Sequence, residues 1–394
     1  MTPGAHLATA IEVLDQVLAG EPAGLTLTNW GRRNRFAGSR DRAAIRDIVF
    51  DCLRRRQSLS HQMGGALSGR ALVLAYAASA GDDLDSMFSG GKYHAAPVTD
   101  AEAAQLADAA DAPDHVRLNY PKFLDAELRR SLGEKFVPVM AAMTARAPVD
   151  LRVNRGRGRM PVAVAALKAE DIAVVPVPGV DTALRVTENQ RRIGNSLAYR
   201  EGLVELQDAS SQAVTLMADA APGMKVLDYC AGGGGKALAL YDAIRGNGQV
   251  VAHDIAPVRM NDLPKRAARA GARITIAGPG HKAMVKGGFD LVFVDAPCTG
   301  TGSWRRTPDA KWRLTQADVD RATATQAAVL EQAAQYVRPG GTLFYATCSI
   351  LQVENSDRTA AFLENDPGFQ LKNQRVFTPL DCGDGFFGAK LVKV

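Results

Sequence analysis

The spacing of apolar residues separates a helical first part of the chain from a later part in which short apolar runs alternate with helical segments. Over residues 1–88, apolar positions recur at helical spacing, which predicts amphipathic helices near 5–18, 40–57 and 68–80. Residues 89–115 are acidic, rich in alanine and poor in large apolar side chains. We therefore expect a helical domain over 1–88 and a linker with one short helix over 89–115.

The rest of the chain predicts a small α+β module over 116–200 and an α/β domain over 201–394. The elements expected in the module are a helix over 122–144, a strand over 149–154, a helix over 161–169 and strands over 172–177 and 182–187. In the last domain, apolar runs alternate with helical segments, which is typical of a doubly wound parallel sheet. These runs lie at 226–229, 249–253, 273–276, 290–294 and 341–346.

Two cysteines and a glycine cluster follow three of these apolar runs. Cys298 lies in a Pro-Cys-Thr-Gly segment shortly after the run at 290–294, and Cys348 follows the run at 341–346. The glycines occupy 232–235, just after the run at 226–229. Open α/β sheets place their ligands at the carboxyl ends of the strands. We therefore expect a cofactor loop and two reactive thiols that face one site.

The glycine loop by itself leaves two cofactors open. Gly232-x-Gly234-x-x-Ala237 fits a dinucleotide fingerprint, and Asp254 lies where a carboxylate that binds ribose is expected. S-adenosylmethionine is held by the same geometry, so a hydride carrier and a methyl donor both fit. A Walker phosphate loop is excluded, because Lys236 is followed by alanine rather than serine or threonine.

The pair of thiols favours methyl transfer over hydride transfer. Hydride transfer needs no cysteines at the sheet edge. Carbon 5 of cytosine is a poor nucleophile until a thiolate adds at carbon 6, so its methylation requires covalent catalysis. Asp295, three residues before Cys298, is placed to protonate ring nitrogen 3. Positive charge that favours a thiolate is available in the neighbouring sequence from Lys236, Arg305, Arg306 and Lys311.

Positive charge is concentrated in two segments, although the net charge of the chain is only +5. Residues 30–57 hold nine arginines and three aspartates. This density favours contact with RNA phosphates, and a merely solvated helix face is the alternative. Residues 152–159 alternate arginine with glycine or small residues in Arg-Val-Asn-Arg-Gly-Arg-Gly-Arg. A flexible loop that contacts phosphate and a simple surface turn are both open for this run.

Bulk properties indicate a cytoplasmic enzyme with two or three domains. The chain has 394 residues, of which 46% are hydrophobic, and no unbroken apolar stretch long enough to span a membrane. No secretion signal precedes the first helix. Five cysteines without Cys-x-x-Cys spacing or a nearby histidine pair predict free thiols, with no disulfide and no metal site. Neither a heptad repeat nor a large apolar stripe is present, so we expect a monomer.

The chain from about Tyr120 to its end resembles the RsmB-type RNA (cytosine-5) methyltransferases. The resemblance rests on five segments, each of which is similar to a motif of that family. They are Val204-Glu-Leu-Gln-Asp-Ala-Ser-Ser-Gln212, Leu227-Asp-Tyr-Cys-Ala-Gly-Gly-Gly-Gly-Lys236, Asp295-Ala-Pro-Cys-Thr-Gly-Thr-Gly302 with Arg305-Arg-Thr-Pro-Asp-Ala-Lys-Trp312, Tyr345-Ala-Thr-Cys-Ser-Ile350 with Glu354-Asn-Ser356, and Asp384-Gly-Phe-Phe-Gly-Ala-Lys390.

The resemblance implies a Rossmann-like methyltransferase domain that uses S-adenosyl-L-methionine, preceded by an RNA-binding α+β module and a NusB-like helical domain. It implies that Cys348 is the nucleophile, that Cys298 assists product release and that Asp295 contacts the target base. The substrate implied is a cytosine extruded from structured RNA, with ribosomal RNA as the expectation. The implied cofactor residues are Cys230, Ala231, Gly232, Gly233, Gly234, Gly235, Lys236, Asp254, Arg259 and Asp295.

The sequence also departs from this family in two places near the cofactor. Gly233 and Ala237 replace a usual proline and threonine, and the segment Ile276-Ala-Gly-Pro-Gly280 lacks the usual carboxylate after the third strand. A noncatalytic RNA-binding or ribosome-assembly factor on the same fold is therefore the alternative function. A nicotinamide-dependent dehydrogenase is a more distant one.

Overall fold

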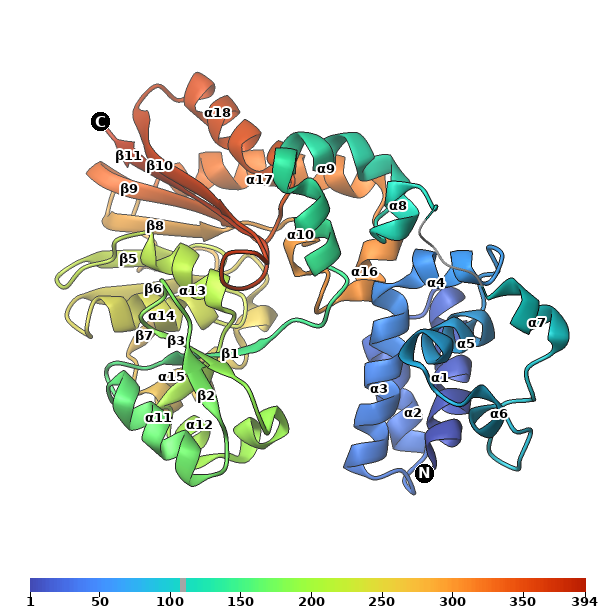
Figure 1. Cartoon of the computed structure of the whole chain (residues 1–394). Coiled ribbons are helices and arrows are strands. Elements are labelled where there is room, and N and C mark those ends of the chain that lie inside the picture. Colours follow the sequence, from blue (N-terminus) through green and yellow to red (C-terminus); the bar gives the residue numbers. More distant parts are fainter. Residues whose placement is uncertain (107–110) are drawn as a thin grey trace. The chain divides into compact units, whose positions relative to one another are not determined.

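The structure is a computed structural model of the chain that describes residues 1–106 and 111–394 (Figure 1). The predicted linker over 89–115 includes residues 107–110, which lie outside the described residues. The described chain forms two compact units. Unit one comprises residues 1–129, 133–146 and 304–314, and unit two comprises residues 130–132, 147–303 and 315–394.

Unit one is built from helices. They are α1 (Pro3–Leu18), α2 (Ala23–Arg33), α3 (Ser39–Arg54), α4 (Arg56–Gln62), α5 (Gly69–Ala80), α6 (Leu84–Met87), α7 (Asp100–Gln105), α8 (Asp114–Arg117), most of α9 (Asp125–Leu132), α10 (Phe136–Ala142) and α16 (Pro308–Arg313). The helices predicted near 5–18 and 68–80 are confirmed as α1 and α5. The helix predicted over 40–57 is divided at Arg55. The helix predicted over 122–144 is divided into α9 and α10, with one 3-10 turn before α9 and another between the two helices. The sequence pattern missed α2.

Local sequence explains where α1 and α5 begin. The hydroxyl of Thr2 accepts a hydrogen bond from the amide of Ala5 at the start of α1, and Ser68 caps α5 in the same way through Ala71. Each cap satisfies one of the amide groups that a helix leaves without a partner in its first turn. Apolar side chains from α1, α3 and α5 then form one core. It includes Leu14, Ile45, Val49, Leu53 and Leu72.

The segment 304–314 caps the carboxyl end of α3. The indole nitrogen of Trp312 donates a hydrogen bond to the carbonyl oxygen of Leu53 at 2.6 Å, and the ammonium of Lys311 donates to the carbonyl oxygen of Arg54 at 3.1 Å. These are terminal carbonyls that α3 itself leaves without a partner. Burial, followed by the charges of Arg56 and Arg54, lowers the pKa of Lys311 well below its usual range. Lys311, expected as a source of charge for the thiols, therefore serves as a cap for α3.

Unit two contains a small antiparallel sheet and a large mixed sheet. The small sheet has the order β2-β3-β1-β4, with β1 at Val149–Val153, β2 at Val174–Pro176, β3 at Ala183–Val186 and β4 at Val204–Leu206. Helices α11 (Met160–Ala169) and α12 (Leu197–Arg200) accompany it. The strands predicted before residue 200 are confirmed. The sequence pattern assigned residues 204–206 to the next domain, whereas the structure pairs β4 with β1.

The large sheet has the order β10-β11-β9-β8-β5-β6-β7. Its parallel strands are β5 (Lys225–Asp228), β6 (Gln249–His253), β7 (Ile274–Ala277), β8 (Phe289–Asp295) and β9 (Val337–Thr347), which confirms all five predicted runs. The sequence pattern missed β10 (Phe369–Phe377) and β11 (Phe386–Lys393), which add antiparallel to one edge. The sheet is thus mixed rather than purely parallel.

Helices cover both faces of the large sheet. Adjacent residues of β5 point to opposite faces, so Val226 packs into one core with residues of α13 (Ala209–Leu216), α14 (Gly235–Ala243) and α15 (Leu263–Ala270). Leu227 packs into the other core with residues of α17 (Gln316–Ala334) and α18 (Ser356–Asn365). This arrangement is the doubly wound α/β architecture that the sequence predicts. Among the described residues, no helix combines the length and apolar character that a membrane crossing requires.

We expect Trp312→Phe to destabilise unit one by about 1–2 kcal/mol, because it removes the donor to the carbonyl of Leu53 while it keeps an aromatic ring in the core. Urea unfolding monitored by circular dichroism measures this change. Trp30→Phe is the matched control, since its indole nitrogen has no hydrogen bond among the described residues. An equal loss of stability in Trp312→Phe and Trp30→Phe would contradict the proposed capping role of Trp312.

Candidate functional site

The two cysteines that follow β8 and β9 meet at the carboxyl edge of the large sheet. These strands are parallel neighbours, with Asp295 paired to Ala346 in the register. The thiol sulfurs of Cys298 and Cys348 lie 3.4 Å apart. Both residues are half-buried, and neither takes part in a disulfide. The juxtaposition expected from the sequence is therefore present.

The environment of Cys298 keeps its thiol protonated. The hydrogen bond with Cys348 is the largest cause of a pKa that is raised well above its usual range, and burial adds to it. A thiol with a raised pKa is a poor nucleophile and an available proton donor.

The carboxylate of Glu354 is hydrogen-bonded to both cysteine loops. Glu354 is fully buried, and it accepts hydrogen bonds from the amide of Thr299 at 2.8 Å and from the hydroxyl of Ser349 at 2.5 Å. Thr299 follows Cys298 and Ser349 follows Cys348, so one side chain fixes both loops. The hydroxyl of Thr299 and the side-chain amide of Gln326 also donate to it. Charge-assisted bonds of this kind are stronger than neutral ones.

The backbone around the thiols is closely packed. The amide of Gly302 donates to the carbonyl oxygen of Cys348 at 2.9 Å, and the amide of Gly385 donates to the carbonyl oxygen of Gly302 at the same distance. A side chain at position 302 would place its Cβ 2.1 Å from the carbonyl oxygen of Gly385. Only glycine therefore allows the loop after Cys298 to pack against the loop before β11.

An ion pair lies beside the thiols. The ammonium of Lys236, at the start of α14, is 2.7 Å from a carboxylate oxygen of Asp295, at the end of β8. Burial opposes the charge of Lys236, but attraction and hydrogen bonding to Asp295 outweigh it, so the pKa of Lys236 is raised. The Asp295 side chain remains one-third exposed. Its carboxylate thus has an open side for a ligand.

The glycine loop has the backbone geometry that a cofactor requires. Gly232 and Gly234 have positive φ angles of 50° and 78°, which side chains rarely adopt. A Cβ at Gly234 would also lie 2.2 Å from a methyl carbon of Leu263. Cys230 and Ala231 lead into this turn, Gly233 lies between the two positive-φ glycines, and Gly235 begins α14. The loop residues that the sequence singles out therefore lie together at the end of β5.

Asp254 at the end of β6 holds the glycine loop. One of its carboxylate oxygens accepts a hydrogen bond from the amide of Gly232 at 3.0 Å, and the other accepts one from the amide of Ala256 at 3.0 Å. Arg259 approaches the first oxygen at 3.3 Å and is itself more than half exposed. Asp254 and Arg259 thus lie where the sequence predicts a pocket for the cofactor, and their contact with ribose stays a prediction.

Two features of the site were not predicted from the sequence. Ile255 and Val258, beside Asp254, are 82% and 69% exposed and offer apolar surface at the sheet edge. Asp228, the last residue of β5, is fully buried, and among the described residues neither of its carboxylate oxygens has a hydrogen-bond partner. Burial, and next the charge of Asp295, raises the pKa of Asp228 from 3.8 to about 8. The signal available in the sequence was an acid at the end of an apolar run, shortly before the glycine loop.

Comparison with known proteins agrees with this geometry. The family model for the 16S rRNA methyltransferase RsmB/F matches residues 215–391, and the model for the RsmF/B-like ferredoxin-like domain matches residues 120–191. Ribosomal RNA small subunit methyltransferase B of Klebsiella pneumoniae is 33% identical over 304 residues, which is 74% of this chain and 70% of that protein. The chain belongs to the RsmB/F methyltransferase family. The protein of the same name from Citrobacter koseri is 32% identical over 72% of this chain and 68% of its own length.

Solved structures show the same fold in this RsmB/F family member. A methyltransferase homolog protein from Pyrococcus horikoshii superposes with a TM-score of 0.62, at 25% identity, over 71% of this chain and 98% of that one. NSun6 from Pyrococcus horikoshii with SFG has a TM-score of 0.61 at 17% identity, over 70% of this chain and 98% of that one. The matched ferredoxin-like model covers β1, β2 and β3 of the small sheet.

The RsmB/F family is S-adenosylmethionine-dependent, and the residues at the edge of β5 and β6 fit this cofactor. S-adenosylmethionine carries positive charge on its sulfonium and amino groups, which would favour the ionised form of Asp228 when the cofactor is bound. The glycine turn permits close backbone approach, as at the nucleotide sites of related sheets. Gly278 and Pro279, which follow β7, supply no carboxylate. Apolar contact with Ile255 and Val258 is then available for a flat ring.

Glu354→Gln should lower stability by about 1–3 kcal/mol, since an amide cannot accept all the hydrogen bonds that the carboxylate receives. We also expect a lower methylation rate with unchanged S-adenosylmethionine affinity, because the cysteine loops lose their common anchor. Urea unfolding and calorimetry measure the two effects. Glu331→Gln, on the exposed side of α17, is the control. An unchanged stability and rate in Glu354→Gln would contradict the anchoring role.

Asp228→Asn should change how stability depends on pH. The folded-state pKa of Asp228 is raised, so the parent protein loses stability as pH rises from about 4 toward about 8 and no further above it. The loss attributable to this one group is at most about 1.4 kcal/mol for each pH unit. Urea unfolding at about pH 5 and about pH 8 should show a smaller decline in Asp228→Asn than in the parent or in the exposed control Asp181→Asn. Identical declines in stability in the parent and in Asp228→Asn would refute the raised pKa assigned to Asp228.

Proposed function

We propose that this protein methylates carbon 5 of a cytosine in RNA, through a transient covalent bond between Cys348 and carbon 6 of the base. The observation that carries the proposal is the pair of thiols 3.4 Å apart at the ends of β8 and β9, next to the Lys236–Asp295 ion pair. A covalent route explains why a methyltransferase site holds a nucleophile at all. S-adenosylmethionine, when bound, supplies the methyl group.

The resemblance of the two cysteine motifs to those of the family supports the order of their roles. In that order Cys348 attacks carbon 6, and Cys298, whose pKa is raised by its hydrogen bond with Cys348, retains its proton. After methyl transfer, a base from solvent takes the proton on carbon 5, and the bond between Cys348 and carbon 6 breaks. Cys298 lies against the sulfur of Cys348 and donates its proton to that sulfur as it leaves.

Asp295 and Lys236 are proposed to hold the target base. The open side of the Asp295 carboxylate can accept hydrogen bonds from the amino group of cytosine and from ring nitrogen 3 once that nitrogen is protonated, and protonation at nitrogen 3 makes carbon 6 more electrophilic. Lys236 fixes the orientation of Asp295 through the 2.7 Å ion pair. Because carbons 5 and 6 are inaccessible in a base stack, the substrate cytosine has to be extruded.

Ribosomal RNA of the small subunit is the substrate class that the relatives' names support. The arginine-rich α3 in unit one supports contact with RNA phosphates. Its basic residues from the sequence segment 30–57 include Arg40, Arg42, Arg46 and Arg54. Arg54 itself is buried and donates to the carbonyl of Arg305, so the exposed arginines carry this role.

A noncatalytic RNA-binding or assembly factor is the second candidate. The observation that favours it is the segment after β7, where Gly278 and Pro279 stand without a carboxylate. Calorimetry with S-adenosylmethionine separates the two candidates. Measurable binding supports the enzyme, and its absence supports the assembly factor.

Cys298→Ala should accumulate a covalent adduct between protein and RNA, because the adduct forms at Cys348 and its release is slowed. Cys348→Ala should form none. Incubation with S-adenosylmethionine and RNA, followed by denaturing gel electrophoresis, reveals the adduct as a slowly migrating band. Cys382→Ala, at a buried cysteine in another part of unit two, should behave like the parent.

Adduct in Cys348→Ala but not in Cys298→Ala would reverse the two roles. Tritium transfer from labelled S-adenosylmethionine into RNA by a double serine variant of the two cysteines would disprove covalent catalysis. Bisulfite sequencing of RNA from cells with and without the gene identifies the modified cytosine.

A further inference from the structure

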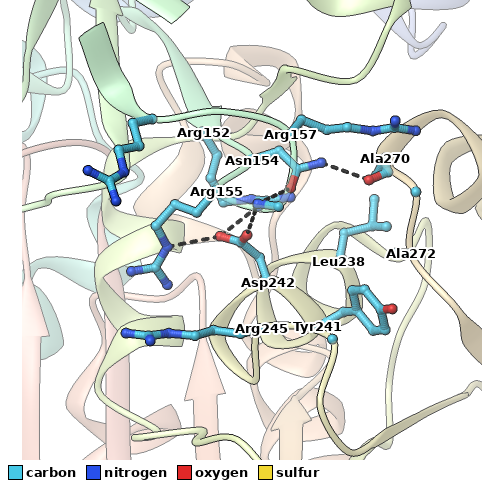
Figure 2. A pocket seen from close by; sticks show the side chains of 14 residues that line it. Arg152, Asn154, Arg155, Arg157, Leu238, Tyr241, Asp242, Arg245, Ala270 and Ala272 are labelled. Carbon is cyan, nitrogen blue, oxygen red and sulfur yellow. Dashed lines mark hydrogen bonds and ion pairs between the residues drawn. The ribbon is translucent and has the colours of Figure 1, made fainter. Parts of the chain in front are cut away.

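A cavity of unit two that has five arginines among its lining residues lies away from the thiols. Its volume is about 640 Å³, and its wall is formed by the Arg-Gly segment after β1, the carboxyl half of α14 and the end of α15 (Figure 2). Helix α14 begins in the glycine loop at Gly235 and runs for nine residues, a length of about 13 Å. Tyr241, Asp242 and Arg245 therefore lie at the far end of this helix from the cofactor residues.

The cavity is strongly positive. Five arginines line it against a single carboxylate, that of Asp242. They are Arg152, Arg155, Arg157, Arg159 and Arg245. Figure 2 shows the guanidinium groups of Arg155 and Arg245 on one side of Asp242, and Arg157 extending on the other side. Such a concentration of guanidinium groups attracts a polyanion.

One of these arginines is buried with an unused donor. The side chain of Arg152 is 3% exposed, and its Nη1 has no hydrogen-bond partner among the described residues. Its Nε is held by the side chain of Gln207 at 2.8 Å, and its Nη1 is 3.8 Å from Asp242, beyond hydrogen-bonding distance. A buried N–H without a partner is costly. An anion in the cavity would satisfy it.

Asp242 organises the loop instead of neutralising the cavity. One of its oxygens accepts a hydrogen bond from the amide of Gly156 at 3.1 Å, and the other accepts one from Nε of Arg155 at 3.2 Å. Asn154 fixes the base of the loop through the carbonyl oxygens of Gly202 and Ala270. The Arg-Gly segment forms an exposed turn, in which the amide of Arg157 donates to the carbonyl oxygen of Asn154 at 2.9 Å, and these bonds hold that turn in the cavity wall.

Arg245 lines the cavity from the carboxyl end of α14. It is the second residue after the helix, and its φ angle of 53° is the left-handed conformation that commonly ends a helix.

We propose that this cavity binds phosphate groups of the RNA backbone, as a second RNA contact apart from the site at the thiols. The inference rests on the proposed RNA substrate and adds a binding site to it. Guanidinium groups bind phosphate oxygens in pairs, and the ring of Tyr241 with the apolar side chain of Leu238 lines the same cavity beside them. This contact orients structured RNA without reading its sequence.

The test is a double charge reversal, Arg155→Glu with Arg245→Glu, measured by fluorescence anisotropy with a labelled RNA hairpin at several salt concentrations. Loss of two phosphate contacts should weaken binding on the order of tenfold at low salt and reduce the slope of log affinity against log salt by about 1.5. S-adenosylmethionine affinity should not change. The control Arg321→Glu with Arg375→Glu makes the same charge change on exposed arginines of unit two, each paired with an aspartate as Arg155 is.

The outcomes separate this site from the proposed function. Binding and methylation of RNA by the parent, with unchanged RNA binding by the pocket variant, would overturn the cavity proposal alone. Equal weakening in the pocket and control variants would also overturn it, since only total charge would then matter. No RNA binding by the parent would overturn both proposals. If the double variant fails to fold, Arg245→Gln at the exposed position replaces it and should reduce the salt slope by about 0.8.

Competition with inorganic phosphate alone distinguishes the RNA backbone from a free ion. Phosphate should displace the hairpin only weakly, because one ion makes few of the contacts that a chain of phosphates makes. Displacement by low phosphate concentrations in the parent, lost in the pocket variant, would assign the cavity to a small anion and overturn the RNA proposal.

Discussion

The buried carboxylate of Glu354 is the interaction on which the thiol site depends. The ends of β8 and β9 are adjacent because parallel strands share one edge, but adjacency alone leaves the loops beyond them free to diverge. Glu354 accepts hydrogen bonds from residues directly after both cysteines and sets the two sulfurs 3.4 Å apart. Burial makes these bonds strong and makes their loss costly. The chemistry of the pair follows from that distance, because the hydrogen bond with Cys348 raises the pKa of Cys298.

Unit two contains two buried ionisable groups whose charges are opposite in sign, and each suits a ligand of the other sign. At the edge of β5 and β6, the carboxylate of Asp228 is buried without a partner, which suits a cofactor that carries positive charge. At the far end of α14, the buried guanidinium of Arg152 has an unused donor, which suits phosphate. Uncompensated buried polar groups are rare in folded proteins. Each of these two groups is therefore a candidate for a hydrogen bond or ion pair with a ligand.

Residues 304–314, which follow the loop of Cys298, stabilise unit one and also form part of a family motif. Trp312 and Lys311 donate hydrogen bonds to the last carbonyl groups of α3. This segment is 250 residues or more away from α3 along the chain, so its partners are invisible to local pattern analysis. The arginine-rich helix and a part of the cysteine motif thus share one folded unit.

The sequence by itself determined the α/β class, the five parallel strands, the cofactor loop and the meeting of the two thiols, because apolar periodicity and glycine placement are local signals and parallel strands share an edge. Tertiary structure decided what depends on distant partners. It paired β4 with β1 and added β10 and β11 at the edge of the large sheet. It also placed Lys311 against the end of α3, buried Asp228 without a hydrogen-bond partner among the described residues and brought five arginines together around Asp242. These outcomes depend on burial and on contacts between remote segments, which no local pattern of residues encodes.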